Sequence, residues 1–279
     1  IRGDGMDRKL VFATLLFFVF IAAFIFVMIN SELKNFSYLR ATYPKLSEDV
    51  YNLRRSSMYI WGIRLFLSFL LPYIFLVSKF SQRISVLVGE KHGLFLSGLF
   101  YGIIIFGIIF LVNLPLNFYS GFYLRHKFGL TDQSILRWLE LNLKSFLVND
   151  IVTSLFLWFP YLLLFHMPNN WYMVLGVIGI PVIIFLVFIS PFVIDPFFND
   201  YHPMEEGSLK DGIQILLEEA GIEDANIFVV DKSKDTKTMN AYVTGIFSAK
   251  RIVLWDTTIN NLTEDEVISI TAHEIGHYV

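Results

Sequence analysis

The sequence predicts a multi-pass α-helical membrane protein of about five transmembrane helices, followed by a small soluble α/β unit. Hydrophobic residues make up 55% of the 279 residues and charged residues 17%, whereas a soluble domain usually carries about 25% charged residues. Residues 1–194 hold 16 Lys and Arg against 9 Asp and Glu, and residues 195–279 hold 6 against 16. This composition excludes an ordinary soluble protein and a disordered one.

Net charge and cysteine content exclude further classes of protein. The net charge is −3, so no nucleic-acid partner is expected. The sequence has no cysteine, which excludes a disulfide framework, a thiolate metal site and a cysteine nucleophile.

Five apolar runs account for the membrane part. A helix needs about 20 apolar residues to cross the bilayer core, and backbone groups in lipid must pair internally, so each run is expected to be a helix. The first run is too long for the apolar region of a signal peptide and is interpreted as an anchor. The fourth run is the shortest. The expected spans are 10–29, 59–78, 93–114, 151–167 and 172–194, within a membrane domain of residues 1–200.

The positions of Lys and Arg between the spans predict the topology. The loops 30–58 and 115–150 carry nine, and the segments on the other side carry six. This bias places both loops and the acidic tail in the cytoplasm and the N-terminus outside. The expected membrane is the endoplasmic reticulum if the source is eukaryotic, and the inner or plasma membrane if it is bacterial. Arg64 lies inside the second span, where we expect it to snorkel to the interface; the alternative is a polar cavity.

The acidic tail has the pattern of an α/β unit. Apolar residues at helical spacing predict a helix over 208–220, with Gly221 as its stop. A short β-branched run predicts a strand at 226–230. Two further strands are expected at 240–244 and 251–255, joined as a hairpin.

The last helix has a well-marked beginning. Thr263 and Glu266 have the spacing of a capping box, and Leu262 and Val267 have the spacing of a hydrophobic staple. Acidic residues in the first turn complement the helix dipole. The helix is therefore expected to begin near Glu264 and to be too polar for a membrane span.

Residues 273–277 form an H-E-x-x-H motif on this helix. Residues four apart share a helix face, so His273 and His277 can hold one ion. Zinc binds His nitrogen at about 2.0–2.1 Å, and the adjacent Glu274 can take the proton from zinc-bound water. The motif therefore predicts a Zn2+ hydrolase site. The alternative is a fortuitous pair of surface histidines on a non-catalytic membrane scaffold with a vestigial motif.

With these residues the sequence resembles the type-1 CAAX prenyl proteases, which are integral-membrane zinc endopeptidases of the gluzincin kind. The resemblance covers nearly the whole chain in the same order. The other segments that carry it are Lys-Phe-Gly-Leu-Thr at 127–131, Asp-Pro-Phe-Phe-Asn at 195–199, Asn-Ala-Tyr-Val-Thr-Gly at 240–245 and Lys-Arg-Ile-Val-Leu-Trp-Asp-Thr at 250–257.

The resemblance implies roles for the matching residues. Residues 201–279 would be the N-terminal part of a zincin-like metallopeptidase domain. His273 and His277 would be zinc ligands and Glu274 the general base. Asn240, Ala241 and Tyr242 would line the cleft, their backbone pairing with an extended substrate; without the resemblance an ordinary hairpin strand is the simpler interpretation.

The resemblance also implies a substrate class. The substrates would be proteins or peptides cut near a lipidated C-terminus, in a water-filled chamber between membrane helices. Whether the natural substrate is prenylated stays open. An HtpX-like quality-control metalloprotease is the alternative enzyme, although that family has fewer spans before its metal helix.

Two features depart from the family pattern. Asp235 stands where the family usually has a basic residue, which bears on substrate preference. The third zinc ligand of the family is a Glu on a later helix, beyond Val279. The chain as given is therefore expected to be an N-terminal portion, truncated after the motif, with an incomplete zinc site and no activity.

Overall fold

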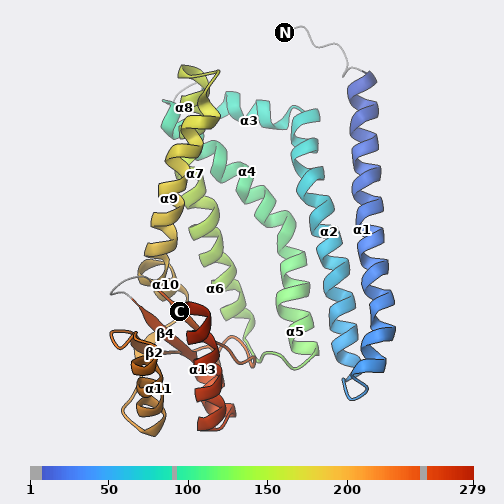
Figure 1. The fold of residues 1–279 in the computed structure, drawn as a ribbon. Coiled ribbons are helices and arrows are strands. Elements are labelled where there is room, and N and C mark those ends of the chain that lie inside the picture. Colours follow the sequence, from blue (N-terminus) through green and yellow to red (C-terminus); the bar gives the residue numbers. More distant parts are fainter. Residues whose placement is uncertain (1–7, 90–92, 246–249) are drawn as a thin grey trace. The chain divides into compact units, whose positions relative to one another are not determined.

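The computed structural model describes residues 8–89, 93–245 and 250–279 (Figure 1). These residues form two compact units. One comprises residues 8–89 and 108–124, and the other comprises residues 93–107, 125–245 and 250–279.

In the first unit, two long helices form a hairpin and a shorter helix follows. They are α1 (Arg8–Thr42), α2 (Glu48–Val77) and α3 (Phe80–Gly89). The segment 30–58, predicted to be a loop, is therefore nearly all helix. Its charged residues end the apolar runs, but Glu, Lys and Arg are good helix formers, so the backbone hydrogen bonds continue through them.

Arg64 of α2 is hydrogen-bonded to a neighbouring helix. Its Nη2 donates to Asn117 Oδ1 and to Ser120 Oγ, both at 2.9 Å. These acceptors lie at the end of α4 (Leu94–Asn117) and in the π-helix η1 (Phe118–Tyr123). The guanidinium thus has polar partners within the span, which fits polar surroundings better than the expected snorkelling.

The fourth candidate span is one long helical segment, Ile135–His166. The predicted span at 151–167 occupies the C-terminal half of this longer helical segment. Polar residues such as Asn142 lower the hydropathy of this segment without interrupting the helix, because their side chains bond to its own backbone: Asn142 Nδ2 donates to the Trp138 carbonyl at 2.8 Å. The helices after α4 are α5 (Leu124–Lys127), α6 (Ile135–Ser145), η2 (Phe146–Ile151), α7 (Val152–Phe156), α8 (Trp158–His166), α9 (Trp171–Val193) and α10 (Asp195–Phe198).

In the part of the chain that the structure describes, five helical segments are long and apolar enough to cross a membrane, as predicted. Four of them begin or end well beyond the predicted bounds, because the helices continue through polar residues. The segments are Val11–Thr42, Glu48–Val77, Leu94–Lys127, Ile135–His166 and Trp171–Val193.

The second unit also contains a sheet, which has four strands among the described residues. Its order is β1-β2-β4-β3, with β2 and β4 parallel and the two outer pairs antiparallel. The three predicted strands and the antiparallel pairing of the last two are confirmed. Three residues are too few for β1 to show a pattern in the sequence. The strands are β1 (Tyr201–Pro203), β2 (Asn226–Val230), β3 (Ala241–Thr244) and β4 (Arg251–Trp255).

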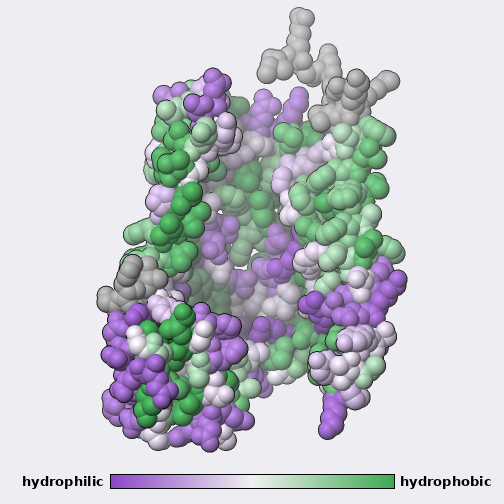
Figure 2. Space-filling view, in the orientation of Figure 1, coloured by the Kyte–Doolittle hydropathy of each residue, from purple (hydrophilic) through white to green (hydrophobic). Residues whose placement is uncertain are grey.

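Two helices cover one face of this sheet. They are α11 (Ser208–Glu219) and α13 (Glu264–Tyr278), and the short α12 (Asp256–Asn261) precedes α13. Gly221, at φ 69°, ends α11 as predicted. Figure 2 shows hydrophilic surface with a hydrophobic strip over α11 and α13. It shows mostly hydrophobic surface along α9 and along the upper part of α1, whose lower part is hydrophilic. The buried core between helices and sheet includes Ile213, Leu217, Ile227, Ile252, Leu254, Val267 and Ile275.

The other face of the sheet meets the end of the last candidate span. Arg251 of β4 lies over the Phe192 ring, with 4.0 Å from its guanidinium carbon to the ring centroid. Its Nη1 donates to the Pro191 carbonyl at 2.9 Å. The sheet is thereby held against α9 on the face opposite α13.

Candidate functional site

The start of α13 is fixed by the predicted capping box. The Thr263 amide donates to Glu266 Oε2 at 2.9 Å, and the Thr263 hydroxyl donates to the same oxygen at 2.9 Å. The backbone hydrogen bond, followed by that of the hydroxyl, holds the pKa of Glu266 below its ordinary value. Val267 and Ile275 are buried against the sheet. The exposed side of the helix is therefore set by its cap and its core face.

The two motif histidines meet on that exposed side. His273 Nε2 and His277 Nε2 lie 2.9 Å apart, and their ring centroids are 4.5 Å apart with the rings nearly perpendicular. Two nitrogens bound to one tetrahedral zinc at 2.0–2.1 Å would be roughly 3.3 Å apart. The pair thus needs to open by only a few tenths of an ångström, so these donors fit zinc.

Glu274 lies on the flank of α13 that faces β3. The Tyr278 hydroxyl donates to the Gly245 carbonyl, directly after β3, at 3.0 Å. On the other flank Ile268 fills the space beside Gly212 of α11, where an added Cβ would come within 2.7 Å of its Cδ1. Glu274 is one turn before Tyr278 on the same flank. It is half-buried, beside the histidines and toward the edge of the sheet.

Within residues 8–89, 93–245 and 250–279, no group of three or more His, Asp or Glu side chains is arranged to hold a metal ion. Among the residues that the structure describes, His273 and His277 therefore have no third His, Asp or Glu ligand beside them. The other histidines in these ranges are not brought to them.

Strand β3 is an edge of the sheet, paired with β4 along one side. The Asn240 carbonyl accepts from the Trp255 amide at 3.1 Å, and the Asn240 amide donates to Thr258 Oγ1 at 2.8 Å. Hydrogen-bonded and non-bonded pairs alternate along an antiparallel ladder. The amides and carbonyls of Ala241 and Val243 therefore point to the free edge, while those of Asn240 point inward.

The three residues predicted to bind substrate lie on different sides of the sheet. Ala241 is buried in the core under α13, whereas Asn240 is exposed. Tyr242 points to the opposite face, where its hydroxyl lies 3.2 Å from that of Tyr201. Burial, followed by this hydrogen bond, raises the pKa of Tyr242. A cavity of about 460 Å³ on that face is lined in part by both tyrosines and by Lys232.

Two residues at the site were not singled out in the sequence. Val243 offers backbone groups to the free edge, and Thr258 holds Asn240 from α12 through two hydrogen bonds, at 2.8 and 2.7 Å. An edge strand could be recognised only from the strand order of the sheet. Thr258 lies on a helix of six residues, which is too short to give a periodic signal.

Two family models match the chain. The model described as CAAX prenyl protease N-terminal, five membrane helices, matches residues 46–200. The model described as peptidase family M48 matches residues 203–279. Together they cover both the candidate membrane spans from α2 onward and the sheet with α13.

Similar proteins include bacterial and yeast relatives. An uncharacterized metalloprotease of Bacillus subtilis, YhfN, is 31% identical over 87% of this chain and 56% of its own length. CAAX prenyl protease 1 of Saccharomyces cerevisiae is 37% identical over 60% of this chain and 37% of its own length. The chain thus spans about half or less of the length of these curated relatives.

The crystal structure of Ste24p from S. mikatae has a similar fold, with a TM-score of 0.75 and 28% identity. The match covers 94% of this chain and 66% of that one. It therefore extends over both the membrane helices and the sheet. Since the five-helix model alone covers more than half of its residues, the chain belongs to the CAAX prenyl protease family, within peptidase family M48.

Proposed function

We propose that this chain carries the metal helix and the substrate-binding edge strand of a membrane zinc metalloendopeptidase. The observation that supports this most directly is the pair of histidine nitrogens, 2.9 Å apart on the exposed side of α13. Glu274 lies beside them, on the flank of α13 that faces β3. A pair of histidine ligands for the metal, a carboxylate beside them and the outer edge of a strand next to the carboxylate suit hydrolysis of an extended peptide.

His273 and His277 would hold the metal through their Nε2 atoms. When bound, zinc polarises the scissile carbonyl and lowers the pKa of water. Glu274 would accept the proton of the attacking water and deliver it to the nitrogen of the leaving amine. Its half-buried position limits competition from bulk water for that proton.

The substrate would pair with β3 as an added strand. Ala241 and Val243 would hydrogen-bond its backbone, because their amides and carbonyls point to the free edge. The main chain of Asn240 is already bonded to Trp255 and Thr258, so Asn240 would support the strand from behind. Tyr242 would pack on the opposite face of the sheet, beside Tyr201, and would thereby keep β3 in place.

The substrate class follows from the family. Relatives from yeast to human are named CAAX prenyl proteases, so proteins or peptides with a lipidated C-terminus are the proposed substrates. We further propose that residues 1–200 form the membrane domain and residues 201–279 the peptidase part, on the cytoplasmic side, as the excess of Lys and Arg indicates.

The test uses Glu274→Gln and His273→Ala in the intact protein that contains this chain. Glu274→Gln should leave the bound zinc near one per chain while peptide hydrolysis falls by at least about a thousandfold. His273→Ala should lose the zinc itself, because one of its ligands is gone. Retained hydrolysis in Glu274→Gln would refute the role of the carboxylate, and unchanged zinc content in His273→Ala would refute the metal assignment.

A further inference from the structure

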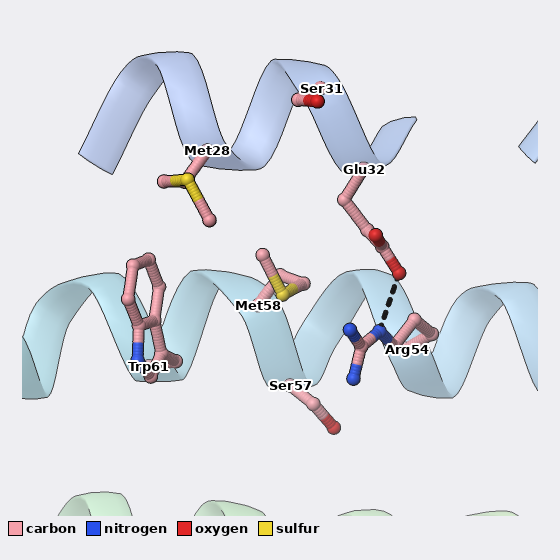
Figure 3. A pocket seen from close by; sticks show the side chains of 7 residues that line it. All are labelled: Met28, Ser31, Glu32, Arg54, Ser57, Met58 and Trp61. Carbon is pink, nitrogen blue, oxygen red and sulfur yellow. Dashed lines mark hydrogen bonds and ion pairs between the residues drawn. The ribbon is translucent and has the colours of Figure 1, made fainter. Parts of the chain in front are cut away.

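A pocket of about 530 Å³ lies between α1 and α2, in the first unit. Its lining combines apolar and polar side chains. Met28 and Met58 point toward each other between the helices, with Trp61 beside them, and the pair of Glu32 and Arg54 closes one end (Figure 3). Ser31 and Ser57 complete the lining.

The guanidinium at this end is only partly used. Arg54 Nε donates to Glu32 Oε1 at 2.7 Å, and this is its contact with an acid. The Arg54 side chain is 56% exposed, and its two terminal nitrogens carry four further N–H donors. A planar guanidinium with free donors is well suited to a phosphate group. The pair has one hydrogen bond and an exposed guanidinium, and such a partly exposed ion pair contributes little by itself, so Glu32 can give way to a second anion.

The apolar end continues along the helices. The Trp61 ring lies 6.4 Å from the Phe24 ring between centroids, and Met28, Phe24 and Trp61 are all exposed. Met28 and Phe24 are one turn apart on α1, so they extend the same face. This exposed track runs from the pocket into the apolar part of both candidate spans. Glu32 and Arg54 lie close to where the uncharged stretches of the two helices end.

Charge and depth point to one kind of occupant. The segment 30–58 holds five Lys and Arg against three Asp and Glu, and basic residues at the end of a membrane span attract anionic headgroups. Tryptophan is typical of the same depth. We propose that this pocket binds an anionic glycerophospholipid, with its phosphate on Arg54 and the start of an acyl chain along Met28, Met58 and Trp61.

The test is native mass spectrometry of the full chain in a neutral detergent, titrated with phosphatidylglycerol or phosphatidylcholine. Phosphatidylglycerol should bind more tightly. Arg54→Gln should weaken it by about tenfold or more, because a charge-assisted hydrogen bond is lost. Glu32→Gln should strengthen it, because the competing carboxylate is removed.

Arg55→Gln is the matched control. It removes the same charge from the next residue, which is exposed and lies outside the pocket lining, and should change binding by no more than about twofold. Trp61→Ala should weaken the lipid without changing net charge. Equal losses in Arg54→Gln and Arg55→Gln would overturn the proposal, as would weaker binding in Glu32→Gln.

Two further measurements separate lipid binding from a folding defect and from binding of a bare anion. Arg54→Lys keeps the charge and should bind phosphatidylglycerol better than Arg54→Gln. If both variants lost binding equally, the loss would come from a folding defect and not from the missing charge. Inorganic phosphate should not displace the lipid, because it lacks the apolar contacts. Displacement by millimolar phosphate would mean that the pocket recognises a bare anion and would overturn the lipid assignment.

Discussion

Replacing Asp235 by Asn should detach the turn after β2 from the start of α6. Arg137 grips Asp235 with two parallel hydrogen bonds, from Nε to Oδ1 at 2.9 Å and from Nη2 to Oδ2 at 3.1 Å. Gln133 Nε2 donates to Oδ1 at 2.9 Å. The side chains of Arg137 and Asp235 are only 15% and 10% exposed, so this is a largely buried ion pair.

The expected cost follows from what the substitution leaves behind. Breaking a buried pair by removing one charge usually costs about 3–5 kcal/mol, because the other charge stays buried. Arg137 keeps two partners, Glu140 at 2.9 Å and the Phe198 carbonyl at 2.8 Å. We therefore expect the lower figure of about 2–3 kcal/mol, which is roughly a 30- to 140-fold change in the opening equilibrium of the turn.

Hydrogen exchange measures this opening directly. The Lys237 amide donates to the Leu130 carbonyl at 2.9 Å, so its protection reports whether the turn stays docked. In Asp235→Asn its protection should fall by roughly 30- to 140-fold. The matched control is Asp224→Asn, which removes the exposed carboxylate of the pair with Lys250 and should change protection by no more than about threefold. Equal effects of the two substitutions would refute the reasoning.

The same pair predicts a pH dependence. Burial by itself raises the pKa of Asp235, but the hydrogen bonds from Arg137 and Gln133 outweigh it and hold this pKa below its ordinary value. A carboxylate with a depressed pKa stabilises the folded state above its unfolded pKa of about 3.9, and this contribution is lost as the pH falls through the folded pKa. Protection of Lys237 should thus decline below about pH 4, and Asp235→Asn should abolish that decline.

Three further substitutions test other parts of the structure. Gly102→Leu should prevent stable packing of α4, because an added Cβ would already come within 2.6 Å of Ser154 Oγ; the fraction recovered as monomer after detergent extraction measures this. Thr258→Val should leave the Asn240 amide without its partner and increase exchange of β3 by about 5- to 150-fold. Thr263→Ala should weaken the start of α13 by about 1 kcal/mol, seen as about fivefold faster exchange in its first turn.

Local signals in the sequence were enough to place α13 and its histidine pair. The capping box at Thr263 and Glu266 fixes its start, and four-residue spacing puts His273 and His277 on one side. Each of these features depends on residues within one or two helical turns. Interactions over such short separations are largely independent of the rest of the fold, so the helix and its histidine pair were predictable.

Contacts between distant segments were not predictable in the same way. Asp235 departs from the family pattern as a sequence position, and this suggested an effect on substrate preference. The structure shows its carboxylate paired with Arg137, 98 residues earlier in the chain, a contact that the sequence did not suggest. The role of β3 as an edge strand likewise depends on β2 and β4 pairing in parallel, with the intervening β3 moved to the outside. Neither relation leaves a periodic or local signal.

On α13, the residues that stabilise the fold differ from the two motif histidines, which is why the histidines can remain exposed. The stability of α13 comes from its cap and from Val267 and Ile275 in the core, so His273 and His277 are not needed for packing. The sheet is anchored on its other face by Arg251, which bonds the end of α9. Because both anchors lie away from the outer edge of β3, the proposed added strand would pair there without disturbing either of them. Substitutions at the histidines should accordingly change metal binding far more than folding.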